Sequence, residues 1–283
     1  MLESIKYFIV HAGTSHLDEV MAVAIVMAMK AMDNGGRVEK EFIYRRDPTQ
    51  EEISDPDVAV IDVGWEHDPD HLCFDHHQFQ RGTKESAMGL VASWLGIREK
   101  IAKLFPWFET RVELDACGPF ATAKSAGTDW STVAKFLGPC EQMVLLAFED
   151  ATDDARWEVV SPLAEMIAAK LAAYDEVKAG LEKRDVGGVE VYDFLADDPA
   201  KTREVSDALV GDRGVAVFHD DRGSGLTMLR LNDDPRIDFS RLAGRPEVLF
   251  AHSGGFIMKT RDKLGRDFVD ELIRLAQGAP LAE

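Results

Sequence analysis

The sequence predicts an α/β protein with two domains joined by a helical linker. Strand-like and helix-like segments alternate in the N-terminal part, which favours a mostly parallel sheet covered by helices. Residues 161–183 have the periodicity of one long helix. From residue 187 onward, short strand-like runs predominate. We therefore expect a first domain at residues 1–160, a linker at 161–186 and a smaller α/β domain at 187–283.

The elements of the first domain follow from its hydrophobic pattern. Lys6–Val10 predicts a buried strand, and Asp18–Met32 predicts a helix rich in Met, Ala, Val and Ile. Arg37–Tyr44 predicts a second strand. Asp57–Val63 predicts a third strand, and because it is apolar on both faces it is typical of a parallel sheet. A helix is expected over Glu85–Leu95, and the chain is predicted to be mostly helical from there to about residue 185.

The linker helix is expected to begin at Ser161, because serine is a good N-cap and Pro162 suits the first helical position. Beyond residue 187, four strand-like runs at 187–194, 214–221, 225–231 and 248–256 predict the sheet of the second domain. The tryptophans show no periodic spacing, so we expect them to pack in the cores. The five are Trp65, Trp94, Trp107, Trp130 and Trp157.

Composition excludes several classes of protein. The 283 residues include 32 basic and 51 acidic ones, and the formal charge is −19. A hydrophobic content of 46% excludes a disordered chain. The acidity argues against coating long nucleic acids and against docking on anionic membranes, because both require clustered Lys and Arg. It does not exclude an enzyme that holds a phosphate ester on bound metal ions.

The cysteines and the N-terminus indicate a cytoplasmic protein. Cys73, Cys117 and Cys140 form no CxxC pair, so neither a disulfide framework nor a cysteine zinc site is expected. The N-terminal segment lacks the basic start and long apolar run of a signal peptide. No apolar run is long enough to span a bilayer.

Histidines and aspartates gather where the predicted strands end. His11 ends the first strand, and His16 and Asp18 lie in the turn into the next helix. Asp62 ends the third strand, and residues 75–77 form an Asp-His-His tripeptide in the loop after it. Because ligands of open α/β sheets bind outside the carboxyl ends of the strands, we expect these segments to converge on one edge.

These residue types predict a metal site. Imidazole and carboxylate without thiolate suit Mn²⁺, Fe²⁺, Co²⁺ or Zn²⁺ better than Ca²⁺. Two metals that share a bridging carboxylate can clamp the attacking and leaving oxygens of a phosphoryl transfer, and Asp62 is well placed to bridge. Taken singly, each residue has an ordinary structural interpretation as a strand-end polar group or a cap. It is their combination that favours the metal site.

Four segments in the same order resemble one known family. They are VHAGTSHLDEVMA from residue 10, VIDVGWEHDPDHLCFDHHQ from residue 60, ESAMGLVASWLG from residue 85 and FAHSGGFIMKTRD from residue 250. They resemble the DHH phosphoesterase superfamily, and within it the melanocyte-proliferating-gene-type branch of metal-dependent hydrolases and 3′–5′ RNA exonucleases. The resemblance implies an N-terminal DHH-type catalytic domain and a C-terminal substrate-binding domain.

The resemblance also implies roles for individual residues. The implied metal ligands are His11, His16, Asp18, Asp62, His76 and Asp115. Among these, Asp62 resembles the bridging carboxylate, and Asp62, His76 and His77 would be catalytic, with His77 on the scissile phosphate. Asp75 would orient the neighbouring histidines. The last ligand is expected at Asp115, with Asp150 as the alternative, because the family's second Asp-Asn is replaced by Cys117-Gly118.

A basic segment near the C-terminus is the predicted substrate-binding region. Residues 241–266 contain six basic and two acidic residues. Gly254 and Gly255 would let backbone N–H groups approach an anion. His252, Lys259 and Arg261 would hold phosphates or a terminal nucleotide, together with His77. A solvated basic surface is the alternative, and the resemblance favours substrate binding.

The functional prediction is a two-metal phosphoesterase. We expect two divalent ions, with Mn²⁺ favoured and Mg²⁺, Co²⁺ or Zn²⁺ as alternatives. We expect 3′–5′ hydrolysis of short RNA or oligonucleotides by water. The alternative substrates are a cyclic dinucleotide, pyrophosphate or a phosphorylated metabolite, and a further alternative is a metal-binding protein without activity. The oligomeric state is left open, with a homodimer among the options.

Overall fold

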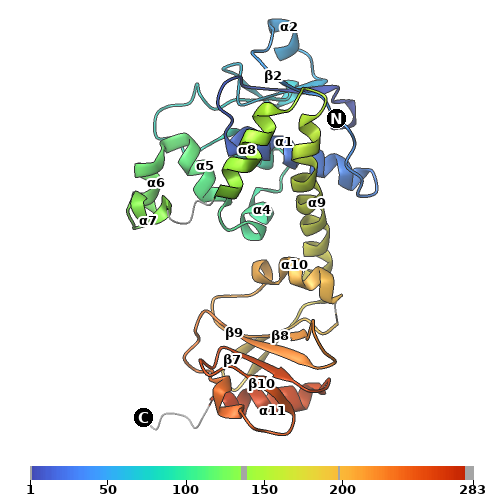
Figure 1. Cartoon of the computed structure of the whole chain (residues 1–283), viewed down its shortest axis with the longest axis vertical. Helices are drawn as coiled ribbons and strands as arrows, with labels where there is room; N and C mark the ends of the chain where they lie inside the picture. Colours follow the sequence, from blue (N-terminus) through green and yellow to red (C-terminus); the bar gives the residue numbers. More distant parts are fainter. Residues whose placement is uncertain (1, 135–138, 197, 278–283) are drawn as a thin grey trace. The chain divides into compact units, whose positions relative to one another are not determined.

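The computed structural model describes residues 2–134, 139–196 and 198–277. The chain divides into two compact units, Met1–Leu171 and Ala172–Glu283, called unit 1 and unit 2 below. Each unit combines a β-sheet with helices, so the predicted α/β fold class is confirmed (Figure 1). Residues 278–283 of the predicted second domain lie outside the described residues.

Unit 1 contains a five-stranded sheet in the order β2-β1-β3-β5-β4. Strand β1 pairs in parallel with β2 and β3, β3 pairs in parallel with β5, and β4 is antiparallel to β5. The central strands β1 and β3 are almost fully buried, as apolar residues on both faces require. The strands are β1 Tyr7–Val10, β2 Ile43–Arg45, β3 Val58–Ile61, β4 His67–Asp68 and β5 Cys73–Phe74.

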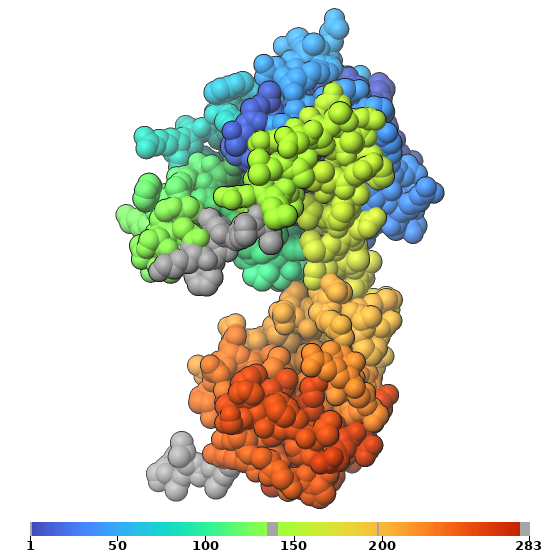
Figure 2. Space-filling view, in the orientation of Figure 1, coloured from blue at the N-terminus to red at the C-terminus, as the bar shows by residue number. Residues whose placement is uncertain are grey.

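Helices make up most of the rest of unit 1. The first of them, α1, is buried along nearly its whole length and packs against α3. The described helices are α1 Leu17–Asp33, α2 Gln50–Ile53, α3 Ala87–Trp94, α4 Arg98–Leu104, α5 Phe108–Cys117, α6 Pro119–Ser125, α7 Trp130–Ala134, α8 Pro139–Asp150 and α9 Arg156–Gly180, with 3₁₀ turns at Leu2–Ser4 and Pro69–His71. The last of them, α9, continues beyond Leu171 into unit 2. In the space-filling view, the yellow-green residues of α8 lie at the surface of unit 1 (Figure 2).

The long helix α9 begins at Arg156 and not at Ser161, so Pro162 lies inside the helix and not at its start. The guanidinium of buried Arg156 donates hydrogen bonds to the carbonyl oxygens of Phe148 (3.0 Å) and Ile43 (2.9 Å). These contacts tie the first turn of the helix to the rest of unit 1. A local N-cap signal cannot reveal such tertiary contacts, which is why the sequence placed the start too late.

Unit 2 contains a six-stranded sheet in the order β10-β11-β9-β8-β7-β6, in which only β7 and β8 pair in parallel. Its core lies between one face of the sheet and α11, with α10 on the other side (Figure 1). The first strand occupies residues that we assigned to the linker. The elements are β6 Glu182–Val186, β7 Val189–Asp193, α10 Pro199–Leu209, β8 Gly214–His219, β9 Leu226–Leu231, a 3₁₀ turn Phe239–Leu242, β10 Val248–Ala251, β11 Ile257–Thr260 and α11 Arg266–Gln277.

The expectation that the tryptophans pack in the cores is wrong for Trp65 and Trp107, whereas Trp94, Trp130 and Trp157 are partly buried. None of the five, all of which are described, belongs to the buried core. Trp65 is 72% exposed and Trp107 is 38% exposed, because both lie in connections between elements and not within a strand. Within the described ranges, no helix is long and apolar enough to cross a membrane.

Candidate metal centre

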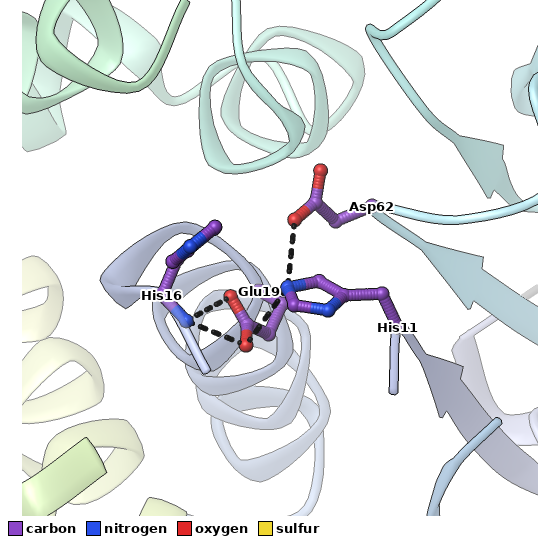
Figure 3. Close-up of side chains that lie close together, drawn as sticks. All are labelled: His11, His16, Glu19 and Asp62. Carbon is purple, nitrogen blue, oxygen red and sulfur yellow. Dashed lines mark hydrogen bonds and ion pairs between the residues drawn. The ribbon is translucent and has the colours of Figure 1, made fainter. Parts of the chain in front are cut away.

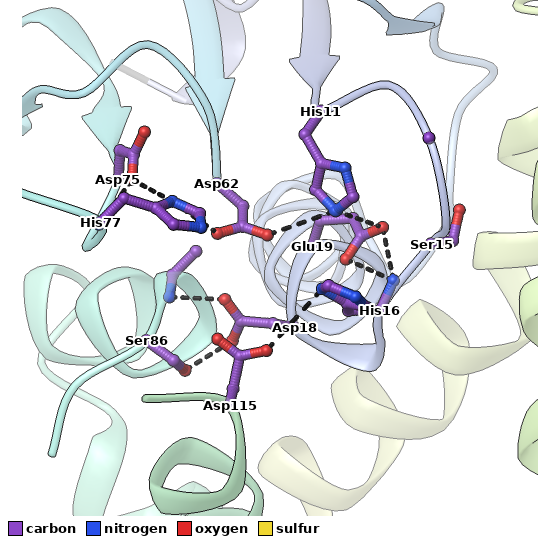
Figure 4. Close-up of polar contacts among 12 residues, drawn as sticks. His11, Ser15, His16, Asp18, Glu19, Asp62, Asp75, His77, Ser86 and Asp115 are labelled. Carbon is purple, nitrogen blue, oxygen red and sulfur yellow. Dashed lines mark hydrogen bonds and ion pairs between the residues drawn. The ribbon is translucent and has the colours of Figure 1, made fainter. Parts of the chain in front are cut away.

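The carboxyl edge of the unit 1 sheet brings together the polar residues that the sequence placed after its strands. β1, β3 and β5 run in parallel, so their ends meet at one edge. His11 follows β1, Asp62 follows β3, and residues 75–77 follow β5. The first turn of α1 and the last turn of α5 complete the cluster (Figure 4).

One group of potential ligands surrounds His11. Its Nε2 lies 3.4 Å from Glu19 Oε1 and 3.6 Å from Asp62 Oδ2, and its ring centroid lies 5.2 Å from that of His16 (Figure 3). Ligand atoms of all four residues lie within 4.8 Å of one another. Four imidazole and carboxylate donors at this spacing can hold one divalent cation.

Two further groups meet at His76. Its Nε2 lies 3.0 Å from Asp115 Oδ2 and 3.3 Å from Asp62 Oδ1. Asp18, His76 and Asp115 form one group, and Asp62, His76 and His77 form the other. Asp62 therefore turns Oδ2 towards His11 and Oδ1 towards His76. One carboxylate that faces two ligand groups has the arrangement that a bridging ligand requires.

Glu19 is the member of the cluster that sequence analysis missed. It is fully buried, and its carboxylate accepts the backbone N–H of His16 at 2.8 and 2.9 Å. An acidic residue three positions after a helix N-cap ordinarily satisfies that N–H, so the position predicts a capping role. The signal that could have found it is its place next to Asp18 and one turn after His16.

Asp18 is held by the start of α3. Its carboxylate accepts hydrogen bonds from Ser86 Oγ (2.5 Å), the Ala87 N–H (2.7 Å) and the Met88 N–H (3.0 Å). Burial, together with the carboxylates of Asp62 and Asp115, holds the pKa of Asp18 well above its usual value. The N-terminus of α3 thus orients the Asp18 carboxylate, whose ionised form is disfavoured by the neighbouring carboxylates.

Asp75 holds the tripeptide in place and lies outside the three ligand groups. Its Oδ2 accepts the Trp65 N–H at 2.7 Å, and its Oδ1 accepts the His77 N–H at 2.8 Å. The same Oδ1 lies 2.7 Å from His77 Nδ1. A carboxylate accepts a hydrogen bond from a protonated Nδ1, so this contact fixes the orientation of the His77 ring.

Electrostatics favour a cation at this edge. Burial raises the pKa of Glu19 to about 9. Burial acts to lower the pKa of His76, but the carboxylates of Asp115 and Asp62 outweigh it and raise the pKa to about 10. In the described part of the chain, the ion pairs of Asp62 and Asp115 are all with histidines.

Two buried polar atoms show whether a metal ion would suit the cluster. His11 Nε2 and Asp62 Oδ1 are inaccessible to solvent and make no hydrogen bond in the described part of the chain. A buried polar atom without a partner is costly, and a coordinated ion would satisfy both. Their imidazole and carboxylate chemistry suits Mn²⁺, Co²⁺ or Zn²⁺. The residues present therefore fit a divalent metal centre.

The two candidates for the last ligand differ in position. Asp115, in the last turn of α5, belongs to a ligand group and lies 4.0 Å from His16 Nδ1. Asp150, at the end of α8, is exposed and belongs to none of the three groups. The geometry thus brings Asp115 into the cluster and leaves Asp150 outside it.

A pocket of about 310 Å³ adjoins the cluster. It contains Arg111, one turn before Asp115 on α5 and ion-paired with Glu141 of α8. An arginine beside metal-binding groups offers a planar donor set for phosphate oxygens. The pocket is lined by His16, Leu17, Asp18, Met88, Arg111, Leu114, Asp115, Glu141 and Leu145.

The residues predicted to bind substrate in unit 2 lie in two environments. His252, Gly254 and Gly255 form the turn between β10 and β11, where the Gly254 N–H donates to His252 Nδ1 (2.9 Å) and the Gly255 N–H to the His252 carbonyl (2.8 Å). Lys259 lines a separate pocket and is ion-paired with Asp220. Arg261 donates to the Pro246 carbonyl at 2.9 Å. In this structure, these donors are therefore engaged within unit 2.

The basic character of residues 241–266 is compensated by acidic residues. Arg241 pairs with Asp238, Arg245 with Glu247, and Arg266 with Glu182. Two of these acids, like Asp220 beside Lys259, lie outside the basic segment. A charge count over one segment could not reveal these partners, because the sheet brings them together.

A known protein family matches the N-terminal third of the chain. Residues 7–102 match the model of the MYG1 exonuclease family, described as uncharacterised protein family UPF0160. Over 68 residues, 24% of this chain, the sequence is 38% identical to the MYG1 exonuclease of Bos taurus, and the match spans only 16% of that protein. The matched segment includes His11, Asp62 and His76 and excludes Asp115, so the matches support the MYG1-type part of the motif resemblance over residues 7–102.

A solved structure was also found. The pGpG-specific phosphodiesterase PggH from Vibrio cholerae aligns over 96% of this chain and 100% of its own, with 12% sequence identity and a TM-score of 0.31. A TM-score this low does not establish a shared fold.

Proposed function

We propose that the protein is a metal-dependent phosphodiesterase of the DHH type that degrades short RNA or oligonucleotides from the 3′ end. The observation that carries the proposal is the position of Asp62, whose two oxygens face two adjoining ligand groups at the carboxyl edge of the sheet. The match of residues 7–102 to the MYG1 exonuclease family supports the same reaction class.

The two ligand sets divide around Asp62. One ion, for which we favour Mn²⁺, would be held by His11, His16, Glu19 and Asp62. A second would be held by Asp62, His76, Asp18 and Asp115, with His77 beside it. Bound ions of this kind supply Lewis-acid polarisation of the phosphoryl group and activation of the attacking water.

His77 contributes a positioned hydrogen-bonding group. Asp75 fixes both the backbone N–H and the Nδ1 of His77. The ring is about half exposed, with 49% of the side chain accessible, so its other nitrogen is available to substrate. We infer that His77 contacts the scissile phosphate and that Asp75 sets the orientation of its ring.

Arg111 supplies the positive charge of the adjoining pocket. Its guanidinium is held by Glu141 and stands one helical turn from Asp115. We infer that it binds a phosphate oxygen of a substrate seated at the cluster, since guanidinium groups match the geometry of phosphate. The surrounding leucines and Met88 give the pocket an apolar wall for the remainder of the substrate.

The test is hydrolysis by the purified full-length chain. We expect Mn²⁺-dependent release of mononucleotides from short RNA, with a 3′ label lost before a 5′ label. His76→Ala and Asp62→Ala should each lower the rate at least hundredfold, because Asp62 faces both ligand sets and His76 belongs to two of the three ligand groups. Asp150→Ala is the matched control and should retain activity, since Asp150 is exposed and outside the cluster.

A substrate panel separates the alternatives. Faster hydrolysis of a cyclic dinucleotide, of pyrophosphate or of a phosphorylated metabolite would replace RNA as the substrate. Bound Mn²⁺ without hydrolysis of any phosphoester would identify an inactive metal-binding protein. Equal activity in EDTA, or in His76→Ala, would contradict the proposal.

A further inference from the structure

Trp65 is an exposed aromatic residue whose position folding does not explain. It follows Gly64 in the connection after β3, and 72% of its surface is accessible. Tryptophan is usually largely buried in a protein, since its large apolar surface stabilises the fold when it packs. A single indole left in water makes little contribution to the core, so a role outside folding has to be considered.

The backbone of Trp65 is also unfavourable for a large side chain. Its φ is 59°, in the left-handed region that glycine adopts most readily. The conformation is maintained because the Trp65 N–H donates to Asp75 Oδ2 at 2.7 Å. The hydrogen bond uses only the main chain, so a glycine at this position would make the same bond without the strain. The structure therefore retains the indole where the backbone does not favour it.

The indole stands beside the catalytic edge. Its ring centroid lies 5.9 Å from that of His77. His77 Nδ1 in turn lies 3.7 Å from Asp62 Oδ1. A group that contacts His77 therefore lies directly beside the ligand groups, because His77 belongs to one of them.

We propose that Trp65 determines specificity by stacking on a nucleobase of the substrate while the attached phosphate lies at His77; the inference rests on the proposed function. Every nucleobase has a π face, so stacking on an exposed indole binds nucleic acid without reading its sequence. Pyrophosphate and simple phosphomonoesters have no such face. Trp65 thus favours nucleotide substrates over small phosphoesters at the same metal centre.

The test is equilibrium binding, measured by calorimetry with Mn²⁺ present. The probes are a phosphorothioate RNA trinucleotide, which resists hydrolysis, and its abasic counterpart. For Trp65→Gly we expect the Kd of the base-bearing probe to rise about 5- to 150-fold, the equivalent of one lost stacking contact. The Kd of the abasic probe should not change. Trp65→Phe should give an intermediate value.

Stability and a control variant exclude a structural explanation. Because glycine suits a φ of 59°, Trp65→Gly should unfold at a temperature at least as high as the wild type. Phe120→Ala removes another exposed aromatic, 79% accessible and outside the ligand groups, and should leave both Kd values unchanged. Weaker binding together with undiminished stability is a result that a merely structural role would not give.

Two outcomes would overturn the inference. One is an unchanged Kd for the base-bearing probe in Trp65→Gly, and the other is an equal loss of affinity for both probes. Failure of the proposed function is a different result, since the wild-type protein would then bind the probe but release no nucleotide from ordinary RNA. The binding measurement decides the role of Trp65 in either case.

Discussion

Buried carboxylates have different hydrogen-bond and ion-pair partners in the two units. In unit 2, Asp234 is fully buried, and the Arg236 guanidinium donates to both of its oxygens at 2.9 and 2.6 Å. In unit 1, Glu19 is equally buried, and its carboxylate faces His11 and a backbone N–H. Asp62, 2% exposed, has ion pairs only with histidines in the part of the chain that the structure describes.

The pKa values of Asp234 and Glu19 differ in the direction that their partners predict. Hydrogen bonds from Arg236 lower the pKa of Asp234, whereas burial raises the pKa of Glu19 to about 9. A fold that needs a buried carboxylate only for structure neutralises it with its own arginine. Among the residues that the structure describes, the ion pair of Glu19 is with His11 and not with an arginine or lysine. A bound cation would stabilise a carboxylate in this environment. Asp234 is thus a structural carboxylate, whereas Glu19 has the environment of a metal ligand.

The largest effect on stability is expected from breaking the structural pair. Asp234→Asn removes the charge and one acceptor that Arg236 requires. We expect the free energy of unfolding to fall by about 1–3 kcal/mol, as for the loss of a charged hydrogen-bonded partner. Hydrolytic activity and the affinity for Mn²⁺ should stay unchanged. Denaturant unfolding of the full chain, with the activity assay beside it, measures both.

A loss of Mn²⁺ affinity in Asp234→Asn would contradict the comparison, because it would make the carboxylate of unit 2 part of the metal chemistry. Arg236→Ala is the matched variant. It breaks the same pair from the other side and should also lower stability without affecting activity.

A smaller effect is expected from a paired carboxylate of unit 1 outside the cluster. Arg46 donates to both oxygens of Glu52, at 2.9 and 2.6 Å, and lowers its pKa to about 2. A lowered pKa stabilises the fold above the unfolded value near 4.5, and that contribution disappears as the pH falls towards 2. Because the Arg46 side chain is 41% exposed, Arg46→Ala should cost about 0.5–1 kcal/mol at neutral pH.

The pH dependence sharpens this prediction. The difference in stability between wild type and Arg46→Ala should be present at pH 7 and shrink between about pH 5 and pH 2, as Glu52 becomes protonated. Unfolding measured across this range tests it. A difference that stays constant down to pH 2 would show that the ion pair is not its source.

The sequence predicted the parts of the site that depend on strand ends. His11, Asp62 and the tripeptide at residues 75–77 follow parallel strands, and parallel strands end at one edge. Asp115 is different, because its place depends on how α5 packs, and it came from the family resemblance alone. Glu19 was missed because a carboxylate at that position ordinarily caps a helix.

Outside the site, the limits of prediction have the same origin. The fold class and the mostly parallel first sheet follow from hydrophobic periodicity, which is a local signal. The start of α9 depends on contacts of Arg156 with distant carbonyl groups, and the exposure of Trp65 depends on a turn held by Asp75. Such tertiary contacts override local propensity, so the sequence could not reveal them.

The central claim is that the carboxyl edge of unit 1 holds divalent cations through Asp62. Equilibrium dialysis against Mn²⁺ with elemental analysis tests it most directly. We predict two equivalents of manganese per wild-type chain and at most one in Asp62→Asn, since Asp62 faces both ligand sets. Wild-type protein that retains no manganese, or Asp62→Asn that retains as much as the wild type, would contradict the account.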